Sequence, residues 1–145
     1  MKSCASPIQT ALYNKLTGTG GHSYVKRWYA QDAVPGAQRQ NRDTGLIDPY
    51  GIIMLVGYDR DDAQSVSGAD HNFQLHFYAS SDTLVQTAAA AAEVLLDGTA
   101  LTLTGSNANW WAAFDGSFIL LREDSPDGRI SHGIQNWRYH TVDSS

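Results

Sequence analysis

The first periodic pattern in the chain is that of a short amphipathic helix. Ser6 and Pro7 have the order of an N-cap and a first helical residue. Ile8, Leu12 and Leu16 then recur every four residues and form one apolar stripe, which the glycines from residue 18 onward terminate. The pattern predicts a helix that docks on a sheet through one face.

A longer, alanine-rich helix is predicted over residues 83–97. Ser81 or Asp82 supplies its N-cap, and Gly98 follows its last residue. Five consecutive alanines permit close packing against a neighbouring element. We expect its apolar side to consist of Leu84, Ala88, Ala91 and Leu95.

Strand patterns fill most of the remaining chain. Residues 50–58 contain a continuous apolar run, which is typical of a strand covered on both faces, and we expect this strand to be central. Residues 71–79 alternate between apolar and polar side chains, which predicts a half-exposed antiparallel strand. Further strand-like runs occupy residues 24–29, 110–114, 117–123 and 129–142, and Pro126-Asp127-Gly128 predicts a hairpin turn between the last two.

The order of these elements predicts an α+β fold. We expect a mainly antiparallel sheet with two helices packed on one face. Two polar stretches, at about residues 35–48 and 59–70, are expected to be long loops. A length of 145 residues suits one core of ordinary size, so residues 1–145 are expected to form a single domain.

Composition and charge exclude several classes of protein. Ten Lys and Arg against fifteen Asp and Glu give a net charge of -5, which is not the electrostatic footprint of a nucleic-acid-binding protein. Cys4 is the only cysteine, which excludes an internal disulfide and fits a reducing compartment. No apolar run has the length of a signal peptide or a membrane span, so we expect neither.

The histidines and acidic clusters do not form a convincing chemical site. His71 and His76 are five residues apart on one predicted strand, so they point to opposite faces, and we expect both at the strand surface. His132 and His140 share a face but lie roughly 26 Å apart along a strand. Residues 59–70 lack the glycine that a calcium loop requires. We therefore predict no catalytic, cofactor-binding or metal-binding residue.

A resemblance to a known family rests on the order of several segments. These are Ile8-Gln9-Thr10-Ala11-Leu12, Pro49-Tyr50-Gly51-Ile52-Ile53, residues 71–78 followed by the alanine-rich helix, residues 95–105, and the hairpin of residues 122–133. In this order the chain resembles the tail-completion, or tail-terminator, family of long-tailed bacteriophages and gene-transfer particles. The resemblance covers about residues 6–142.

The resemblance implies a role in assembly without a chemical reaction. It implies a virion subunit of the tail or neck, assembled in the host cytoplasm, that forms a six-membered ring on the head-proximal end of the tail tube. The ring would contact the tail tube protein and the head-tail connector or stopper protein, with no cofactor and no membrane. Double-stranded DNA would pass through its lumen without specific binding, which the negative charge favours.

A geometric estimate agrees with six subunits. A chain of this length has a radius of gyration of roughly 15 Å and approximates a sphere about 38 Å across. Six such spheres in a ring leave a hole of roughly 38 Å, whereas four leave about 16 Å, too narrow for duplex DNA of about 20 Å.

Candidate interface residues lie in the two polar stretches and among the aromatics. Arg39 and Arg42 could pair with Asp59, Asp61 and Asp62 of a neighbouring subunit. Exposed aromatic side chains would need a partner to cover them, and Trp28 is the candidate among them.

Three alternatives remain open from the sequence. The first is a head-completion, stopper or adaptor protein of the same neck. The second is a small metal-dependent enzyme that uses His71, His76 and residues 59–70. The third is a host-directed regulatory protein that binds one partner as a monomer.

Overall fold

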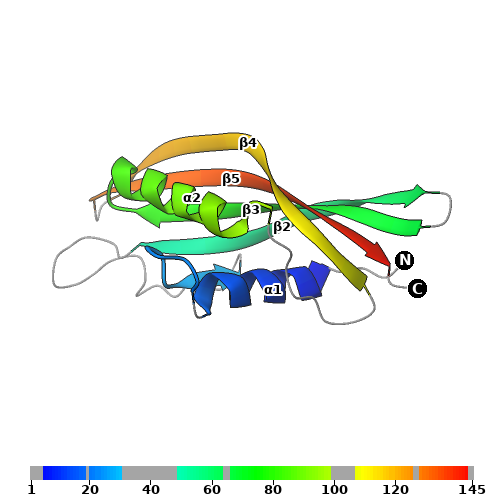
Figure 1. The fold of residues 1–145 in the computed structure, drawn as a ribbon. Coiled ribbons are helices and arrows are strands. Elements are labelled where there is room, and N and C mark those ends of the chain that lie inside the picture. The colour runs from blue at the N-terminus through cyan, green and yellow to red at the C-terminus, as the bar shows by residue number, and fades with distance from the viewer. Residues whose placement is uncertain are drawn as a thin grey trace.

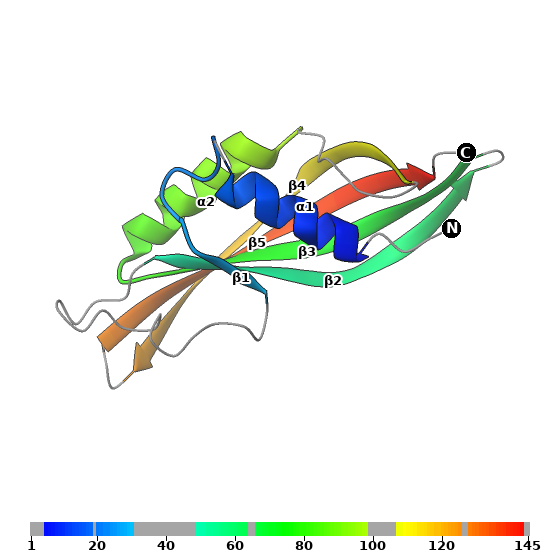
Figure 2. The ribbon, with the colours of Figure 1, turned by 90° about the horizontal axis from the view of Figure 1, so that it is seen from below.

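A computed structural model of the chain describes residues 5–18, 20–30, 49–63, 66–98, 107–125 and 128–143. Along the chain the elements are α1 (Ala5–Thr17), β1 (Trp28–Ala30), β2 (Tyr50–Ala63), β3 (Val66–Ala79), α2 (Asp82–Leu96), β4 (Asn107–Ser125) and β5 (Gly128–Asp143). The described strands form one sheet in the order β1-β2-β3-β5-β4, and both helices lie on one of its faces (Figures 1 and 2). The expected α+β fold, with helices on one side of a mainly antiparallel sheet, is confirmed.

Strand pairing places β3 at the centre of the sheet. It pairs antiparallel with β2, from Tyr50↔Tyr78 to Ala63↔Val66, and with β5 on its other side. β4 and β5 form the expected hairpin, in which the last described pair is Ser125↔Gly128. Among the described strands only β1 is parallel to its neighbour, over three residue pairs. The expectation that β2 would be central is therefore wrong, although Ile52 and Ile53 are indeed buried on opposite faces.

The polar stretch of residues 59–70 is not a loop. It continues β2 and β3 as a long hairpin, with Asp59 paired to Asp70 and Asp62 to Ser67. This part of the sheet extends beyond both helices (Figure 2). Backbone pairing between strands does not require an apolar face, so these polar residues can continue β2 and β3. The lack of apolar alternation in the sequence therefore led to the wrong prediction of a loop. The other predicted loop, residues 35–48, lies outside the described residues.

The main core lies between the helices and the sheet. Leu12 and Leu16 of α1 are buried in it, as their spacing predicted, and the side chain of Ile8 lies outside the described residues. From the sheet, Phe73, Leu75 and Phe77 of β3 and Trp137 of β5 complete it.

Helix α2 is rotated relative to the prediction. It begins after Ser81, whose side chain accepts a 3.3 Å hydrogen bond from the Leu84 amide, and it buries Val85, Ala88, Ala89, Ala92 and Leu96. Of the predicted side only Ala88 is fully buried. An alanine-rich helix has no strong apolar stripe, so the fit to the sheet determines its orientation. Gly133 of β5 lies directly below Val85, and a Cβ at this glycine would be 2.5 Å from Val85 Cγ1.

Of the predicted strand at residues 24–29, only Trp28 and Tyr29 are in a strand, and the chain before them is a bend followed by irregular backbone. The amides of Tyr24 and Val25 donate to Nδ1 of His22, at 3.2 and 2.9 Å. These bonds fold the backbone around the imidazole, so a strand forms only from Trp28 onward. The two predicted runs at residues 110–114 and 117–123 belong to one strand, β4, with register shifts against β5.

Candidate functional site

The predicted interface residues fall into three groups. Arg39 and Arg42 lie outside the described residues, and Asp59, Asp61 and Asp62 lie in the extension of β2, where only the backbone is described. Pairing between these arginines and aspartates stays a prediction.

The remaining candidate, Trp28, is only 3% exposed. Its ring contacts Phe77 edge-on, with centroids 5.7 Å apart, and its Nε1–H donates to the Val25 carbonyl at 3.1 Å. It also lies so close to Gly51 that a Cβ there would collide with the indole. In this structure the Trp28 side chain packs in the core of its own chain.

A row of rings crosses the sheet on the face opposite the helices. Tyr29 of β1 contacts Tyr50 of β2 edge-on, with centroids 6.1 Å apart. Tyr50 stacks on Tyr78 of β3 at 4.8 Å, and Tyr78 stacks on His132 of β5 at 4.1 Å. These four residues join four strands at one end of the sheet, next to the small apolar cluster of Tyr50 and Ile52.

His76 and His132 form a buried pair beside this row. Each of the two residues is 7% exposed, and His76 Nδ1 lies 2.8 Å from His132 Nε2. On the other side of His76, Gln74 Nε2 donates to Asn136 Oδ1, so Gln74 Oε1 accepts from His76 Nε2 at 3.0 Å. His76 therefore carries its proton on Nε2, and its Nδ1 accepts from His132 Nε2. The expectation that His71 and His76 would be surface residues is wrong, because both are buried.

Burial determines the charge state of His76. Desolvation by burial, together with the neighbouring charge of a protonated His132, lowers the pKa of His76 to about 4. A second proton, on Nδ1, would also oppose the Nε2–H of His132. At neutral pH His76 is therefore neutral and acts as a structural hydrogen-bonding group.

Two buried polar side chains attach α2 to the rest of the fold. His22 Nε2 donates to the Ala88 carbonyl at 2.7 Å, and Gln135 Nε2 of β5 donates to the next carbonyl, Ala89, at 3.1 Å. Gln135 Oε1 in turn accepts from Trp137 Nε1 at 2.8 Å. Burial lowers the pKa of His22, whereas its bond to the Ala88 carbonyl raises it, and the net direction is downward.

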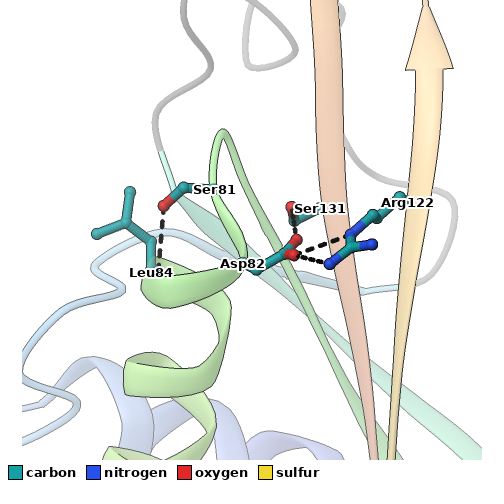
Figure 3. A network of polar contacts seen from close by, with 5 residues as sticks. All are labelled: Ser81, Asp82, Leu84, Arg122 and Ser131. Atoms are coloured by element: carbon teal, nitrogen blue, oxygen red, sulfur yellow. Dashed lines mark hydrogen bonds and ion pairs between the residues drawn. The ribbon is translucent and has the colours of Figure 1, made fainter.

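The first turn of α2 is joined to β4 and β5 by a polar network (Figure 3). Asp82 Oδ2 accepts from Arg122 Nε of β4 at 2.8 Å and from its Nη2 at 2.5 Å. Asp82 Oδ1 accepts from the hydroxyl of Ser131 of β5 at 2.5 Å. The hydrogen bond and the charge of Asp82 raise the pKa of Arg122. This network positions the start of the helix against β4 and β5.

Most of the outward-facing residues of helix α2 are small or apolar, beside the exposed Gln86 and the half-exposed Glu93. We call Thr83, Leu84, Thr87, Ala90, Ala91 and Val94 the α2 outer face; these residues are exposed or half-exposed, and Val94 is 88% exposed. Beside this face, a cleft of about 520 Å³ separates α2 from the segment around Tyr24, which is 57% exposed. Thr87, Ala90, Ala91 and Val94 line both the cleft and the outer face.

A second exposed apolar surface lies on β4. Ile119 and Leu121 are 49% and 42% exposed, while their neighbours Phe118 and Leu120 pack against the core under the helices. Alternation along a strand therefore places Ile119 and Leu121 on the opposite face of the sheet. We call these two residues the β4 ridge.

Among the described residues there is neither a metal-binding cluster nor a membrane-spanning helix. In this part of the chain no three His, Cys, Asp or Glu side chains come together in a way that could hold a metal ion. Neither α1 nor α2 has the length and apolar character that a helix needs to cross a bilayer.

Comparison with known proteins gives a likeness of structure. No protein-family model matches the chain, and no curated protein matches it. Among solved structures, a chain of the virion of a native gene transfer agent particle superposes with a TM-score of 0.61 and 18% sequence identity. The match covers 98% of this chain and 99% of that chain. At this identity the likeness establishes a shared fold.

The polar anchors of the fold were missed from the sequence. His22, Gln135 and Asp82 each find a partner more than 30 residues away along the chain, and no local spacing signals such a contact. His76 and His132 become neighbours only through the register of β3 against β5, in which Tyr78 lies opposite His132.

Proposed function

We propose that the chain is a structural subunit of a phage-like particle. It forms a six-membered ring that ends the tail tube and joins it to the head-tail connector. The observation that carries this proposal is the end-to-end likeness of its fold to a chain of a gene transfer agent virion. The resemblance of the sequence to tail-terminator proteins supports the position at the head-proximal end of the tail.

The buried polar side chains hold the fold together while apolar residues lie exposed at the surface, and this distribution supports a role in assembly. His22, Gln135 and Asp82 hold α2 on the sheet, and the His76–His132 pair connects two central strands. The surface, by contrast, carries the apolar α2 outer face and the β4 ridge. Exposed apolar surface of this kind is typical of proteins that associate with other chains.

The charge of the chain supports the passage of DNA through such a ring. Each subunit carries a net charge of -5. Six subunits around a lumen would repel phosphate groups, so DNA could slide through without binding. A positively charged lumen would instead bind the phosphate groups and hold the genome in the neck.

Electron microscopy of the purified chain and of intact particles tests the proposal. We expect six-fold rings, and a ring of this protein between tail tube and connector. Purified tail tubes incubated with the protein should be capped and should stop adding tube subunits. A protein that is absent from particles, or that leaves tube growth unchanged, would contradict the tail-terminator role.

The capping experiment, elemental analysis and a mass measurement separate the alternatives. A stopper or adaptor protein would bind connectors and leave tube growth unchanged. A small metal-dependent enzyme would contain a stoichiometric ion by elemental analysis, and a monomeric regulator would show the mass of one chain at every concentration.

A further inference from the structure

Both ring nitrogens of His22 are engaged in hydrogen bonds with backbone groups. Nδ1 lies 3.2 Å from the amide nitrogen of Tyr24 and 2.9 Å from that of Val25, and Nε2 lies 2.7 Å from the Ala88 carbonyl oxygen of α2. An amide can only donate a hydrogen bond and a carbonyl can only accept one. The partners therefore fix the neutral ring with its proton on Nε2, and the lone pair of Nδ1 is shared by two amides.

The bend before β1 is held largely through this residue. We call residues 22–26 the His22 bend. Besides the two bonds to Nδ1, the His22 amide donates to the Leu16 carbonyl of α1 at 2.9 Å, and the Lys26 ammonium donates to the His22 carbonyl at 2.7 Å. In irregular backbone of this kind a side chain can supply the partners that a helix or a sheet would otherwise provide.

We propose that His22 is a pH-sensitive switch, in which a proton on Nδ1 releases the His22 bend while α2 stays attached to the ring. An Nδ1–H would face the amide N–H groups of Tyr24 and Val25, so both would lose their acceptor. The Nε2–H would keep its bond to the Ala88 carbonyl, and the positive charge of the ring would strengthen that bond. This inference goes beyond the proposed ring and does not depend on it.

The groups around the imidazole favour its neutral form. His22 is 1% exposed, and the rings of Trp28 and of Phe77 from β3 lie with their centroids 5.6 and 6.2 Å away. Desolvation by burial lowers the pKa of His22, the bond to the Ala88 carbonyl raises it, and the charge of Lys26 lowers it again, so that the net direction is downward.

Lys26 is the charged group that bears on the ring among the described residues. From α1 and α2 the groups bonded to His22 are the carbonyls of Leu16 and Ala88, and within the bend the ring of Tyr24 meets the imidazole edge-on at 6.4 Å. The described contacts therefore include no carboxylate that would stabilise a protonated His22.

Acid should open the His22 bend for this reason. In the open bend water reaches the imidazole, whose pKa then approaches the ordinary histidine value of about 6.5, whereas in the closed bend the pKa of His22 is lower. Below pH 6.5 the open form binds a proton that the closed form does not bind. Each pH unit then multiplies the ratio of open to closed bend by about ten, until the closed form is protonated as well.

Opening of the bend would change the cleft beside α2. Ser23 and Tyr24 line this cleft on one side, and Thr87 and Val94 of α2 line it on the other. Because the Nε2 bond to α2 survives protonation, the helical side stays in place and only the side formed by the bend is released. The switch would therefore alter one surface of the chain in acid and leave the sheet intact.

Amide hydrogen exchange of the full chain, resolved by NMR between pH 7 and 5, tests the switch. Protection is compared after division by the intrinsic exchange rate at each pH. We expect the amides of Tyr24 and Val25 to lose protection by about tenfold for each pH unit below 6.5. At pH 5 low concentrations of urea should leave their exchange unchanged, because local opening exposes little surface, whereas the amide of Ala92 in α2 should respond to urea.

Two variants separate His22 from the other buried histidines. His22→Asn keeps a side-chain acceptor for amides two and three residues further on but does not titrate, so the protection of the bend should no longer depend on pH. His76→Gln removes a buried histidine outside the bend, and its bend should lose protection in acid as wild type does. Circular dichroism checks that every variant is folded.

A second pair of variants tests the role of charge while His22 is retained. Lys26→Gln removes the charge that lowers the pKa of His22 and keeps a donor for the His22 carbonyl. The NMR titration midpoint of the His22 ring should therefore rise, and the loss of protection in acid should be smaller than in wild type. Lys15→Gln removes an exposed charge of α1 and should change neither quantity.

Several outcomes would overturn the switch. Constant protection of the Tyr24 and Val25 amides from pH 7 to 5 would show that acid does not open the bend. Exchange of these amides with the protection and urea dependence of Ala92 would show that they open only when the whole chain unfolds. A pH dependence that persists in His22→Asn, or equal titration midpoints in Lys26→Gln and wild type, would assign the proton to another group.

Discussion

His22 and Ala88 lie 66 residues apart in the chain, and the imidazole Nε2 of His22 donates to the Ala88 carbonyl at 2.7 Å. The same ring accepts the amides of Tyr24 and Val25 through Nδ1. One buried side chain thus fixes the turn before β1 and attaches it to the middle of α2.

Replacing this side chain should be costly because three backbone groups lose a partner. We expect His22→Leu to lower the free energy of unfolding by about 2–4 kcal/mol, since buried amides are left without an acceptor. Urea titration followed by tryptophan fluorescence measures the change. Ser23→Ala, at the exposed neighbouring position, should stay within about 0.5 kcal/mol of wild type. Equal stability of the His22→Leu chain would contradict the role given to His22.

The His76–His132 pair should make stability depend on pH. His76 has a pKa of about 4 in the folded chain, against the ordinary histidine pKa of 6.5 in the unfolded chain. As the pH falls below 6.5 the unfolded state binds a proton that the folded state does not bind, so the free energy of unfolding falls until about pH 4. The shift corresponds to about 3 kcal/mol.

A variant isolates this pH dependence from that of the carboxylates. His76→Gln removes the titrating group, so its stability should fall less than that of wild type between pH 6.5 and 4. Urea unfolding at a series of pH values gives both curves. His22, whose pKa is also lowered, is present in both chains and cancels in the difference. Parallel curves would show that His76 does not titrate in this range.

Gly133 should be intolerant of any side chain. A Cβ at this position would lie 2.5 Å from Val85 Cγ1 and 2.8 Å from Phe118 Cε2. We expect Gly133→Ala to destabilise the chain by about 1–3 kcal/mol through overpacking between β5 and α2. In a double-mutant cycle Val85→Ala should relieve part of this cost, because it removes the closest atom. Strictly additive effects would show that the contact is not the cause.

Replacing Asp82 should lower the stability of the fold more than replacing its partner Arg122. Asp82→Ala leaves the buried hydroxyl of Ser131 without its acceptor and should cost about 1–2 kcal/mol. Arg122→Gln removes only the solvent-exposed ion pair, so we expect a smaller loss that shrinks further in high salt. Thermal unfolding at low and high ionic strength compares the two variants. An equal loss for both would contradict the role of Ser131.

Much of the fold could be predicted from the sequence. The apolar spacing of Leu12 and Leu16, the alternation of Phe73, Leu75 and Phe77, and the order of elements predicted the α+β class with both helices on one face of the sheet. The same reasoning was wrong where periodicity is weak. In α2 the alanines did not identify the buried side, and at residues 59–70 the polar composition concealed a hairpin.

The candidate surfaces were less predictable than the fold. The sequence suggested loops and Trp28 as contacts, whereas the described structure buries Trp28 and exposes Val94, Ile119 and Leu121. Apolar residues of this kind look the same in a sequence whether they face a core or the solvent. Their exposure depends on the rotation of α2 and on the outermost place of β4 in the sheet.

The sequence by itself determined both helices and the apolar parts of the strands, since helix and strand periods arise from neighbouring residues along the chain. The tertiary structure alone decided which strand is central, which side of α2 is buried and which histidines meet. These features depend on register and packing between segments 30 or more residues apart, such as His76 with His132 and Asp82 with Arg122. Contacts of that range are selected by the fit of whole elements, and no local pattern encodes them.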